Sequence, residues 1–180
     1  GAISAEAQSS EEAVVIDGAQ MTHSLSPMYR LLILGAGDVA KFVAEMAIAL
    51  EYDVMLCDPR PNYLDNWYVP GVEKTAQLPD DVVRERFSNP YSVIVALAHD
   101  PRVDDMALME ALKTDAFYIG AMGSVKTSAA RRQRLPELGL SSDEIDRLHA
   151  PIGFQINSKT PAEIAISVMA EITSVRYQQK

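Results

Sequence analysis

Hydrophobic residues follow two alternating patterns from Tyr29 to the end of the chain. Residues 31–34 form an uninterrupted apolar run, which is typical of a strand buried on both faces of a sheet. Apolar residues then recur at helical spacing over 39–50, and a second apolar run covers 54–57. Strands that alternate with helices predict a parallel sheet with helices on both faces. We therefore expect an α/β fold, a Rossmann-like three-layer sandwich with a mainly parallel sheet.

The alternation continues after an irregular segment. Prolines break the pattern after residue 58, so we expect residues 58–71 to form an excursion anchored by Trp67 and Tyr68. The later pattern predicts helices over 83–87 and 101–113 and strands over 91–98 and 117–119. Ser124 is a suitable N-cap for a further helix that runs towards residue 135.

Two capping boxes predict the last two helices. Ser141 and Glu144 have the spacing of a capping box for a short helix that reaches His149. Thr160 and Glu163 form a second box, with a proline between them at the first helical position. This box opens a long final helix with one apolar stripe. Residues 30–180 are therefore expected to form one domain, preceded by a linker or N-terminal extension over 1–29 in which 13–17 is a potential edge strand.

Composition and charge narrow the class of protein. The 180 residues are 48% hydrophobic, enough for the core of one globular domain, and carry a formal net charge of −9. Such an acidic chain is expected to bind neither nucleic acid nor an acidic membrane surface, and it allows a homodimer without arguing for one. The single cysteine, Cys57, excludes an internal disulfide framework and a Cys-rich zinc site. No apolar run approaches the roughly 20 residues of a membrane span, and we expect a cytoplasmic protein.

The first glycine loop suggests a phosphate-bearing ligand. Gly35 and Gly37 follow a predicted buried strand and open a helix, and Asp58 ends the next strand. Asp58 could bind the two ribose hydroxyls of NAD, or it could cap a turn and pair with Arg60. A purely structural strand-to-helix turn is the alternative interpretation of the loop. Asp38 would repel a pyrophosphate there.

A second glycine loop lies in a basic stretch. Gly120 and Gly123 precede Ser124, and residues 116–136 contain four cations, Arg131 among them, but no acid. This stretch is the natural anion-binding region of so acidic a chain, because a helix N-terminus favours negative charge. The alternative is a solvated, charged helix face.

Two further positions could contact a ligand. His99 lies where a predicted strand meets its loop, so it could act as a base, a metal ligand or a hydrogen-bond donor, or could stabilise a turn. We predict no metal site and assign no catalytic residue. Lys159 precedes the last helix and could reach a phosphate, although residues 151–161 could equally be a plain connecting loop.

Several motifs together resemble the XdhC/CoxI family of accessory proteins for xanthine dehydrogenase and related molybdenum hydroxylases. The resemblance covers residues 30–176 and depends on the first glycine loop, Asp58-Pro59-Arg60-Pro61, His99-Asp100, the stretch over 117–124 and the tail over 151–165. It implies a non-catalytic chaperone that binds molybdenum cofactor (molybdopterin), protects it during sulfuration and assists its insertion. The implied partners are a molybdenum hydroxylase and a cysteine desulfurase.

The resemblance and the motifs together give one set of expected cofactor-binding residues: Gly35, Gly37, Asp38, Asp58, Arg60, His99, Gly120, Gly123, Ser124, Arg131, Lys159 and Thr160. Three departures from the family pattern stand out. Asp38 replaces a usual histidine, and Asn157-Ser158-Lys159 replaces Gly-Ala-Arg. We expect the family's N-terminal half, with its proposed cofactor-binding cysteine, to be missing or encoded elsewhere, and Cys57 is no obvious substitute for that cysteine. An NAD-dependent oxidoreductase and a regulatory nucleotide-binding module are the alternative functions.

Overall fold

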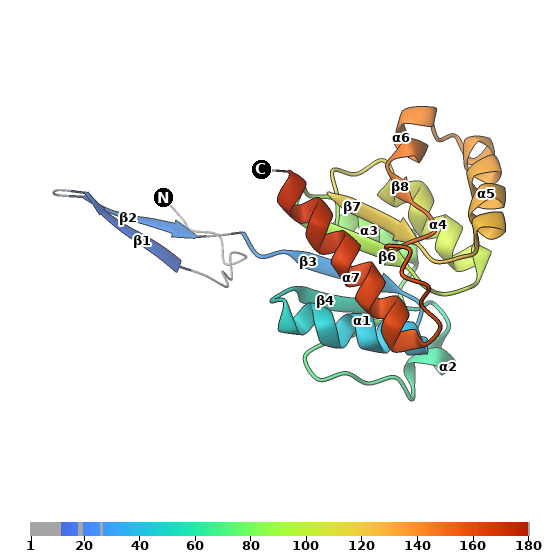
Figure 1. Cartoon of the computed structure of the whole chain (residues 1–180), viewed down its shortest axis with the longest axis horizontal. Helices are drawn as coiled ribbons and strands as arrows, with labels where there is room; N and C mark the ends of the chain where they lie inside the picture. Colours follow the sequence, from blue (N-terminus) through green and yellow to red (C-terminus); the bar gives the residue numbers. More distant parts are fainter. Residues whose placement is uncertain (1–11, 18–19, 26, 180) are drawn as a thin grey trace.

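The computed structural model describes residues 12–17, 20–25 and 27–179, with side chains from residue 27 onward. Its centre is a six-stranded sheet in the order β5-β4-β3-β6-β7-β8, in which every neighbouring pair is parallel (Figure 1). The strands are β3 (Arg30–Leu34), β4 (Asp53–Cys57), β5 (Glu73–Thr75), β6 (Ser92–Ala96), β7 (Tyr118–Ala121) and β8 (Leu148–His149). Numbered from β3, this is the strand order 3-2-1-4-5-6 of the Rossmann fold, which confirms the expected fold class.

Helices cover both faces of the sheet. Helices α1 (Asp38–Ala49) and α7 (Pro161–Gln178) pack on one face, against Leu31 and Ile33 of β3. The alternate residues of β3, Leu32 and Leu34, face the core on the opposite side of the sheet, to which four other helices contribute buried side chains. These are α3 (Pro79–Arg86), α4 (Pro101–Ala111), the 3-10 helix η1 (Leu135–Leu138) and α6 (Ser142–Asp146). Strand β3 is buried on both faces because it lies at the centre of the sheet, as its apolar run predicts.

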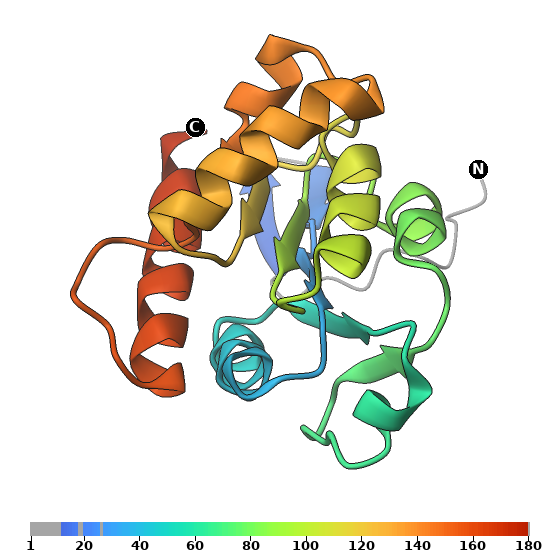
Figure 2. The ribbon, with the colours of Figure 1, turned by 90° about the vertical axis from the view of Figure 1, so that its right-hand side faces the viewer.

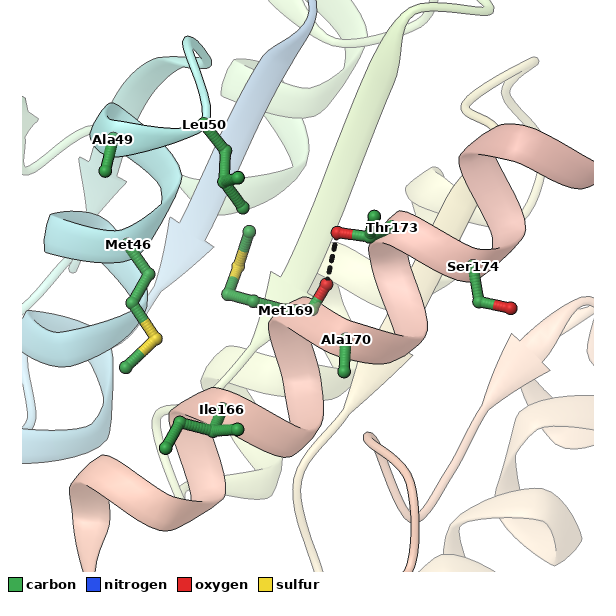
Figure 3. A pocket seen from close by; sticks show the side chains of 8 residues that line it. All are labelled: Met46, Ala49, Leu50, Ile166, Met169, Ala170, Thr173 and Ser174. Carbon is green, nitrogen blue, oxygen red and sulfur yellow. Dashed lines mark hydrogen bonds between the residues drawn. The ribbon is translucent and has the colours of Figure 1, made fainter.

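A groove of about 660 Å³ separates the exposed sides of α1 and α7 (Figure 3). Its walls are apolar or small, and they include Met46 and Leu50 from α1 and Ile166 and Thr173 from α7. The Thr173 hydroxyl donates to the carbonyl oxygen of Met169 at 2.7 Å, so it is satisfied within its own helix.

The predicted helix caps are confirmed. Ser124 accepts a hydrogen bond from the N–H of Thr127, as the N-cap of α5 (Val125–Arg134). Both expected capping boxes are present, at the starts of α6 and α7. These local interactions join residues three apart, so the sequence spacing alone identifies them.

Three expectations about local structure are wrong. The helix that begins at Ser142 ends at Asp146, and residues 148–149 form β8 instead, because they pair with β7 and Arg132 donates to the Leu148 carbonyl at 2.6 Å. Trp67 is buried, but Tyr68 is 70% exposed and anchors nothing. The excursion also contains α2 (Pro61–Leu64) and leads into β5.

The N-terminal extension contains two strands. β1 (Glu12–Asp17) and β2 (Gln20–Leu25) pair antiparallel as a separate two-stranded sheet, so residues 13–17 are not an edge strand of the main sheet. Residues 1–11, 18–19 and 26 of the expected extension lie outside the described residues.

Candidate functional site

The loops that follow β3, β4, β6 and β7 meet at the carboxyl edge of the sheet, which faces the viewer in Figure 2. The strand order reverses between β3 and β6, and open α/β sheets bind ligands in the crevice at such a switch point. The loop between β8 and α7 reaches the same edge. Most of the predicted site residues lie on these loops, whereas Gly120 lies within β7 and Arg131 within α5.

The first glycine loop touches the β6–α4 loop at the switch point. Gly35 has φ +98°, and a Cβ there would lie 2.3 Å from the Cα of Ala98. Only glycine allows this approach. Gly37 is the N-cap of α1 and has open space around it, but exposed Asp38 follows in the first turn. This carboxylate occupies the position at which the helix N-terminus would otherwise attract an anion.

Asp58 is completely buried beneath the first glycine loop. Its Oδ1 accepts hydrogen bonds from the backbone N–H and Nε of Arg60, at 3.0 and 2.8 Å. Its Oδ2 accepts from the N–H of Ala36 at 3.0 Å and from Nη2 of Arg60 at 2.9 Å. Four donors saturate the lone pairs of a carboxylate. Asp58 therefore joins the loops after β3 and β4 and has no oxygen left for a ribose.

The electrostatic environment of Asp58 keeps it ionised. Burial alone would raise the pKa of this carboxyl, but the hydrogen bonds from Arg60 and Ala36 outweigh burial and lower the pKa below its usual value. Arg60 also lies 3.7 Å from Asp100 of the β6–α4 loop. The Arg60 guanidinium is thus shared between two acids rather than directed to the open edge of the site.

The second glycine loop is the more electropositive of the two. Helix α5 starts at Ser124 and has no acid in its first turn. Lys126 in this turn is exposed and makes no ion pair within residues 27–179. Because helix N-termini carry partial positive charge, this combination favours an anion more than the N-terminus of α1 does.

Two cavities open on either side of the second glycine loop. One, of about 450 Å³, lies towards the β6–α4 loop and has His99 and Arg131 in its lining. The other, of about 490 Å³, lies towards residues 151–158. Met122, Gly123, Ser124 and Ile164 line both cavities. The loop between β7 and α5 is therefore central to the concave part of this edge.

Arg131 is buried, with 2% of its side chain exposed, and it connects the loops of the site. Its Nε donates to Asp105 at 3.0 Å, its Nη1 to the Met122 carbonyl at 3.3 Å, and its Nη2 to Asp104 at 3.4 Å. Asp104 in turn accepts a hydrogen bond from the N–H of Ala98 at 3.1 Å. The two acids neutralise the guanidinium, so Arg131 links the β6–α4 and β7–α5 loops more directly than it attracts a ligand.

The carboxyl of Asp104 is the most strongly perturbed acid of this edge. Burial raises its pKa to about 6, against the opposing effects of the Ala98 N–H and of Arg131. His99 lies next to Ala98, is exposed, and has φ +56°, which is uncommon for a residue with a Cβ. No three metal-ligating side chains in the described part of the chain are placed to hold a metal ion.

The loop before α7 forms the outer wall of the second cavity. Gly120 is buried under this loop, since a Cβ there would lie 2.6 Å from Cδ1 of Ile152. Thr160 caps α7 by accepting from the N–H of Glu163 at 3.3 Å. Lys159 is exposed, and its ammonium group has no ion-pair partner in the region described. Neither Lys126 nor Lys159 lines this cavity, but each directly follows a residue that does, Val125 and Ser158 respectively.

Four side chains that fix the loops could not be identified from the sequence: Asp104, Asp105, Tyr118 and Glu171. Asp104 and Asp105 pair with Arg131 across 27 and 26 residues, a separation at which no local pattern exists. Tyr118 and Glu171 lie 53 residues apart and hydrogen-bond to each other. The one signal in the sequence is Glu171 itself, a charged residue beside the apolar stripe of the last helix.

Comparisons with known proteins place this geometry in context. A family model described as the XdhC Rossmann domain matches residues 31–172, which include every loop of the site. The molybdenum cofactor insertion chaperone PaoD of Escherichia coli (strain K12) is 31% identical over 154 residues, covering 86% of this chain and 42% of PaoD. A probable xanthine dehydrogenase subunit of Bacillus subtilis (strain 168) is 28% identical over 153 residues, covering 84% of this chain and 44% of that protein.

A solved structure agrees with the sequence relatives. The crystal structure of a xanthine dehydrogenase from Bacillus halodurans superposes with a TM-score of 0.73 and 28% identity, covering 89% of this chain and 46% of that one. The chain thus spans less than half the length of these relatives. No helix in the described residues is long and apolar enough to cross a membrane.

Proposed function

The chain belongs to the XdhC Rossmann-domain family, and from this premise we propose that it is a cytoplasmic accessory protein that binds molybdenum cofactor for a molybdenum hydroxylase. The observation that carries the proposal is the match of the family model across residues 31–172, because that span contains all the loops of the carboxyl edge. The proposed role is to hold the cofactor, protect it while a separate cysteine desulfurase supplies the terminal sulfur, and release it to a hydroxylase such as xanthine dehydrogenase. A homodimer is compatible with this role.

The cofactor would lie in the cavity between the second glycine loop and residues 151–158. Molybdopterin carries a phosphate, and the N-terminus of α5 offers backbone donors with no acid in its first turn. Lys126 and Lys159 follow the lining residues Val125 and Ser158 and make no ion pairs in the described region, so we propose that they add positive charge for the phosphate. The volume of this cavity, about 490 Å³, falls within the range of roughly 300–1,000 Å³ that is usual for small-molecule sites. The charge and size of this cavity therefore fit the phosphate-bearing molybdopterin.

We propose that Asp58, Arg60 and Arg131 support the site rather than contact the cofactor. Asp58 and Arg60 satisfy each other beneath the first glycine loop. Arg131 is neutralised by two aspartates and fixes the Met122 carbonyl at the cavity. We propose that these three side chains orient the loops. The saturated carboxylate of Asp58 weighs against the alternative of an NAD-dependent oxidoreductase, in which this acid would bind a ribose.

A substitution at a helix cap tests the location of the site. Aspartate caps a helix as well as serine does, so Ser124→Asp should preserve α5 while placing a carboxylate at the proposed phosphate position. We expect it to weaken binding of molybdenum cofactor at least about 10-fold, because two negative charges within roughly 4 Å repel each other strongly near a protein surface. The matched control is Ser141→Asp, which makes the same change at the cap of α6.

The result can contradict the proposal as clearly as support it. Equilibrium binding is measured anaerobically with cofactor released from a donor enzyme. Equal affinity of the Ser124→Asp variant and the wild-type protein would place the phosphate elsewhere, whereas equal losses in both aspartate variants would reflect net charge rather than a local site.

A further inference from the structure

The loop over 151–158 shapes the proposed cavity, and it is held to the domain by the buried side chain of Ile152 and by a few hydrogen bonds. Two are backbone hydrogen bonds, from Ile152 to the carbonyl of Ala121 at 3.0 Å and from Phe154 to the carbonyl of Ser167 at 3.2 Å. Between them, the N–H of Gly153 donates to Oε2 of Glu171 at 2.8 Å. Within the described part of the chain, Glu171 is the one side chain that accepts a hydrogen bond from residues 151–157.

Glu171 is also the centre of a polar network under the loop. Its Oε2 accepts a second hydrogen bond, from the hydroxyl of Tyr118 in β7. Its Oε1 lies 3.3 Å from Nδ1 of His149 in β8. The rings of Tyr118 and His149 stack, with centroids 4.5 Å apart and planes 19° from parallel. One carboxylate therefore joins α7, the neighbouring strands β7 and β8, and the loop.

The negative charge of the Glu171 carboxylate strengthens its hydrogen bonds to the loop and to Tyr118. Burial alone would raise the pKa of Glu171, but the hydrogen bonds from His149, Tyr118 and Gly153 outweigh burial and lower it. Burial and the hydrogen bond to Glu171 both raise the pKa of Tyr118, so the hydroxyl keeps its proton and donates. Hydrogen bonds to an ionised acceptor are roughly twice as strong as neutral ones.

The backbone at Gly153 leaves little freedom for a different arrangement. Gly153 has φ +89°, and a Cβ there would lie 2.5 Å from Oγ of Ser167. The loop therefore runs directly against α7 at the residue whose N–H Glu171 accepts. Immediately beyond it, Phe154 and Ile156 are 45% and 50% exposed and line the cavity. Loss of the Gly153 hydrogen bond would weaken the hold on the part of the loop that faces the ligand, where the hydrogen bond from the Phe154 N–H to the Ser167 carbonyl would remain.

We propose that Glu171 is a positioning residue that holds residues 151–158 in the binding arrangement and thereby sets the affinity of the cavity for its phosphate-bearing ligand. This inference depends on the proposed function, because the ligand is the molybdenum cofactor of that proposal. Tyr118 and His149 keep the carboxylate oriented, and the loop follows its position.

Three variants separate positioning from stability. Glu171→Leu removes the acceptor, and Glu171→Gln keeps an amide oxygen that can accept from both Tyr118 and Gly153. Thr173→Val is the matched control on α7, because Thr173 lines the α1–α7 groove and bonds only within its helix (Figure 3). Amide hydrogen exchange of residues 152–158 is measured without ligand, the melting temperature is recorded, and affinity for molybdenum cofactor is measured anaerobically.

The expected pattern is specific to positioning. In Glu171→Leu, exchange at Gly153 should accelerate roughly 10-fold to 100-fold, the range that corresponds to loss of one hydrogen bond to a charged group. Cofactor affinity should fall at least about 10-fold, since the loop must then be ordered on binding. Glu171→Gln should recover most of the wild-type exchange rate and affinity, and Thr173→Val should change neither. These differences in exchange and affinity should be present even if the variants have the same melting temperature.

Each contrary result has one meaning. Unchanged exchange at Gly153 in Glu171→Leu would show that Glu171 does not hold the loop, and the inference would be wrong. Faster exchange with unchanged cofactor affinity would overturn the positioning role and leave the proposed function intact. Absence of cofactor binding by the wild-type protein would contradict the proposed function, while exchange in the ligand-free variants would still decide whether Glu171 holds the loop.

Discussion

The Asp58 carboxylate accepts two parallel hydrogen bonds from the Arg60 guanidinium, at 2.8 Å from Nε to Oδ1 and at 2.9 Å from Nη2 to Oδ2. The pair lies at the end of β4, where dinucleotide-binding folds use an acid to bind a ribose. Here the acid instead binds a residue two positions along the chain and the N–H of Ala36 in the first glycine loop. The pair therefore joins two loops that border the switch point.

This pairing predicts a pH-dependent contribution to stability. The folded pKa of Asp58 lies below the unfolded value of 3.8. The ionised carboxylate therefore stabilises the fold fully above about pH 4, and this contribution is lost as the pH falls through the folded pKa. Asp58→Asn should lower the free energy of unfolding by about 3 kcal/mol at pH 7 and by progressively less as the pH falls below about 4.

Urea unfolding at a series of pH values measures this difference. A loss that does not shrink as the pH falls below about 4 would mean that the charge of Asp58 does not contribute to stability.

Arg131 and Arg134 provide a matched pair for the role of the buried cation. Both contact Asp105, but Arg131 is 2% exposed and Arg134 is 41% exposed. Arg131→Met should cost about 3–5 kcal/mol, because it leaves the buried carboxyl of Asp104 without its ion-pair partner. Arg134→Met should cost less than about 1 kcal/mol, as is usual for exposed ion pairs. Equal losses in chemical denaturation would argue against Arg131 as the buried link between the loops.

The two glycines of the first loop should tolerate alanine very differently. At Gly35, alanine combines a positive φ with a Cβ 2.3 Å from the backbone of Ala98, so the variant should lose about 3 kcal/mol or more. At Gly37, φ is −106° and nothing lies within 4 Å of an added Cβ. Gly37→Ala should therefore change stability by less than about 1 kcal/mol. Thermal unfolding of the two variants side by side checks this, and similar melting temperatures would contradict it.

Local patterns predict most of the fold. The apolar run of β3 and the capping boxes at Ser141 and Thr160 depend only on neighbouring residues. The structure has strand β3 and the starts of α6 and α7 at the positions that these patterns predict. The end of α6 is different, because pairing with β7 converts residues 148–149 into a strand. Tyr68 and Trp67 are adjacent and both aromatic, and only tertiary packing decides that Trp67 is the buried one.

The site follows from the sequence less completely. The strand-end positions of Gly35, His99 and Gly123 follow from the alternation of strands and helices. Whether Arg131 faces solvent or the interior depends on Asp104 and Asp105, which lie in another helix. The contact between Glu171 and the loop at Gly153 likewise joins segments 18 residues apart. Charge and spacing locate the candidate residues, but long-range hydrogen bonds decide which of them face a ligand and which hold the loops.

Anaerobic equilibrium binding of molybdenum cofactor, with NADH titrated in parallel, tests the proposal that this domain binds the cofactor at the carboxyl edge of its sheet. We expect tight binding of molybdenum cofactor and weak binding of NADH, because Asp58 has no oxygen free for a ribose. Tight binding of NADH with no measurable binding of the cofactor would contradict the proposal and would favour a dinucleotide-dependent enzyme.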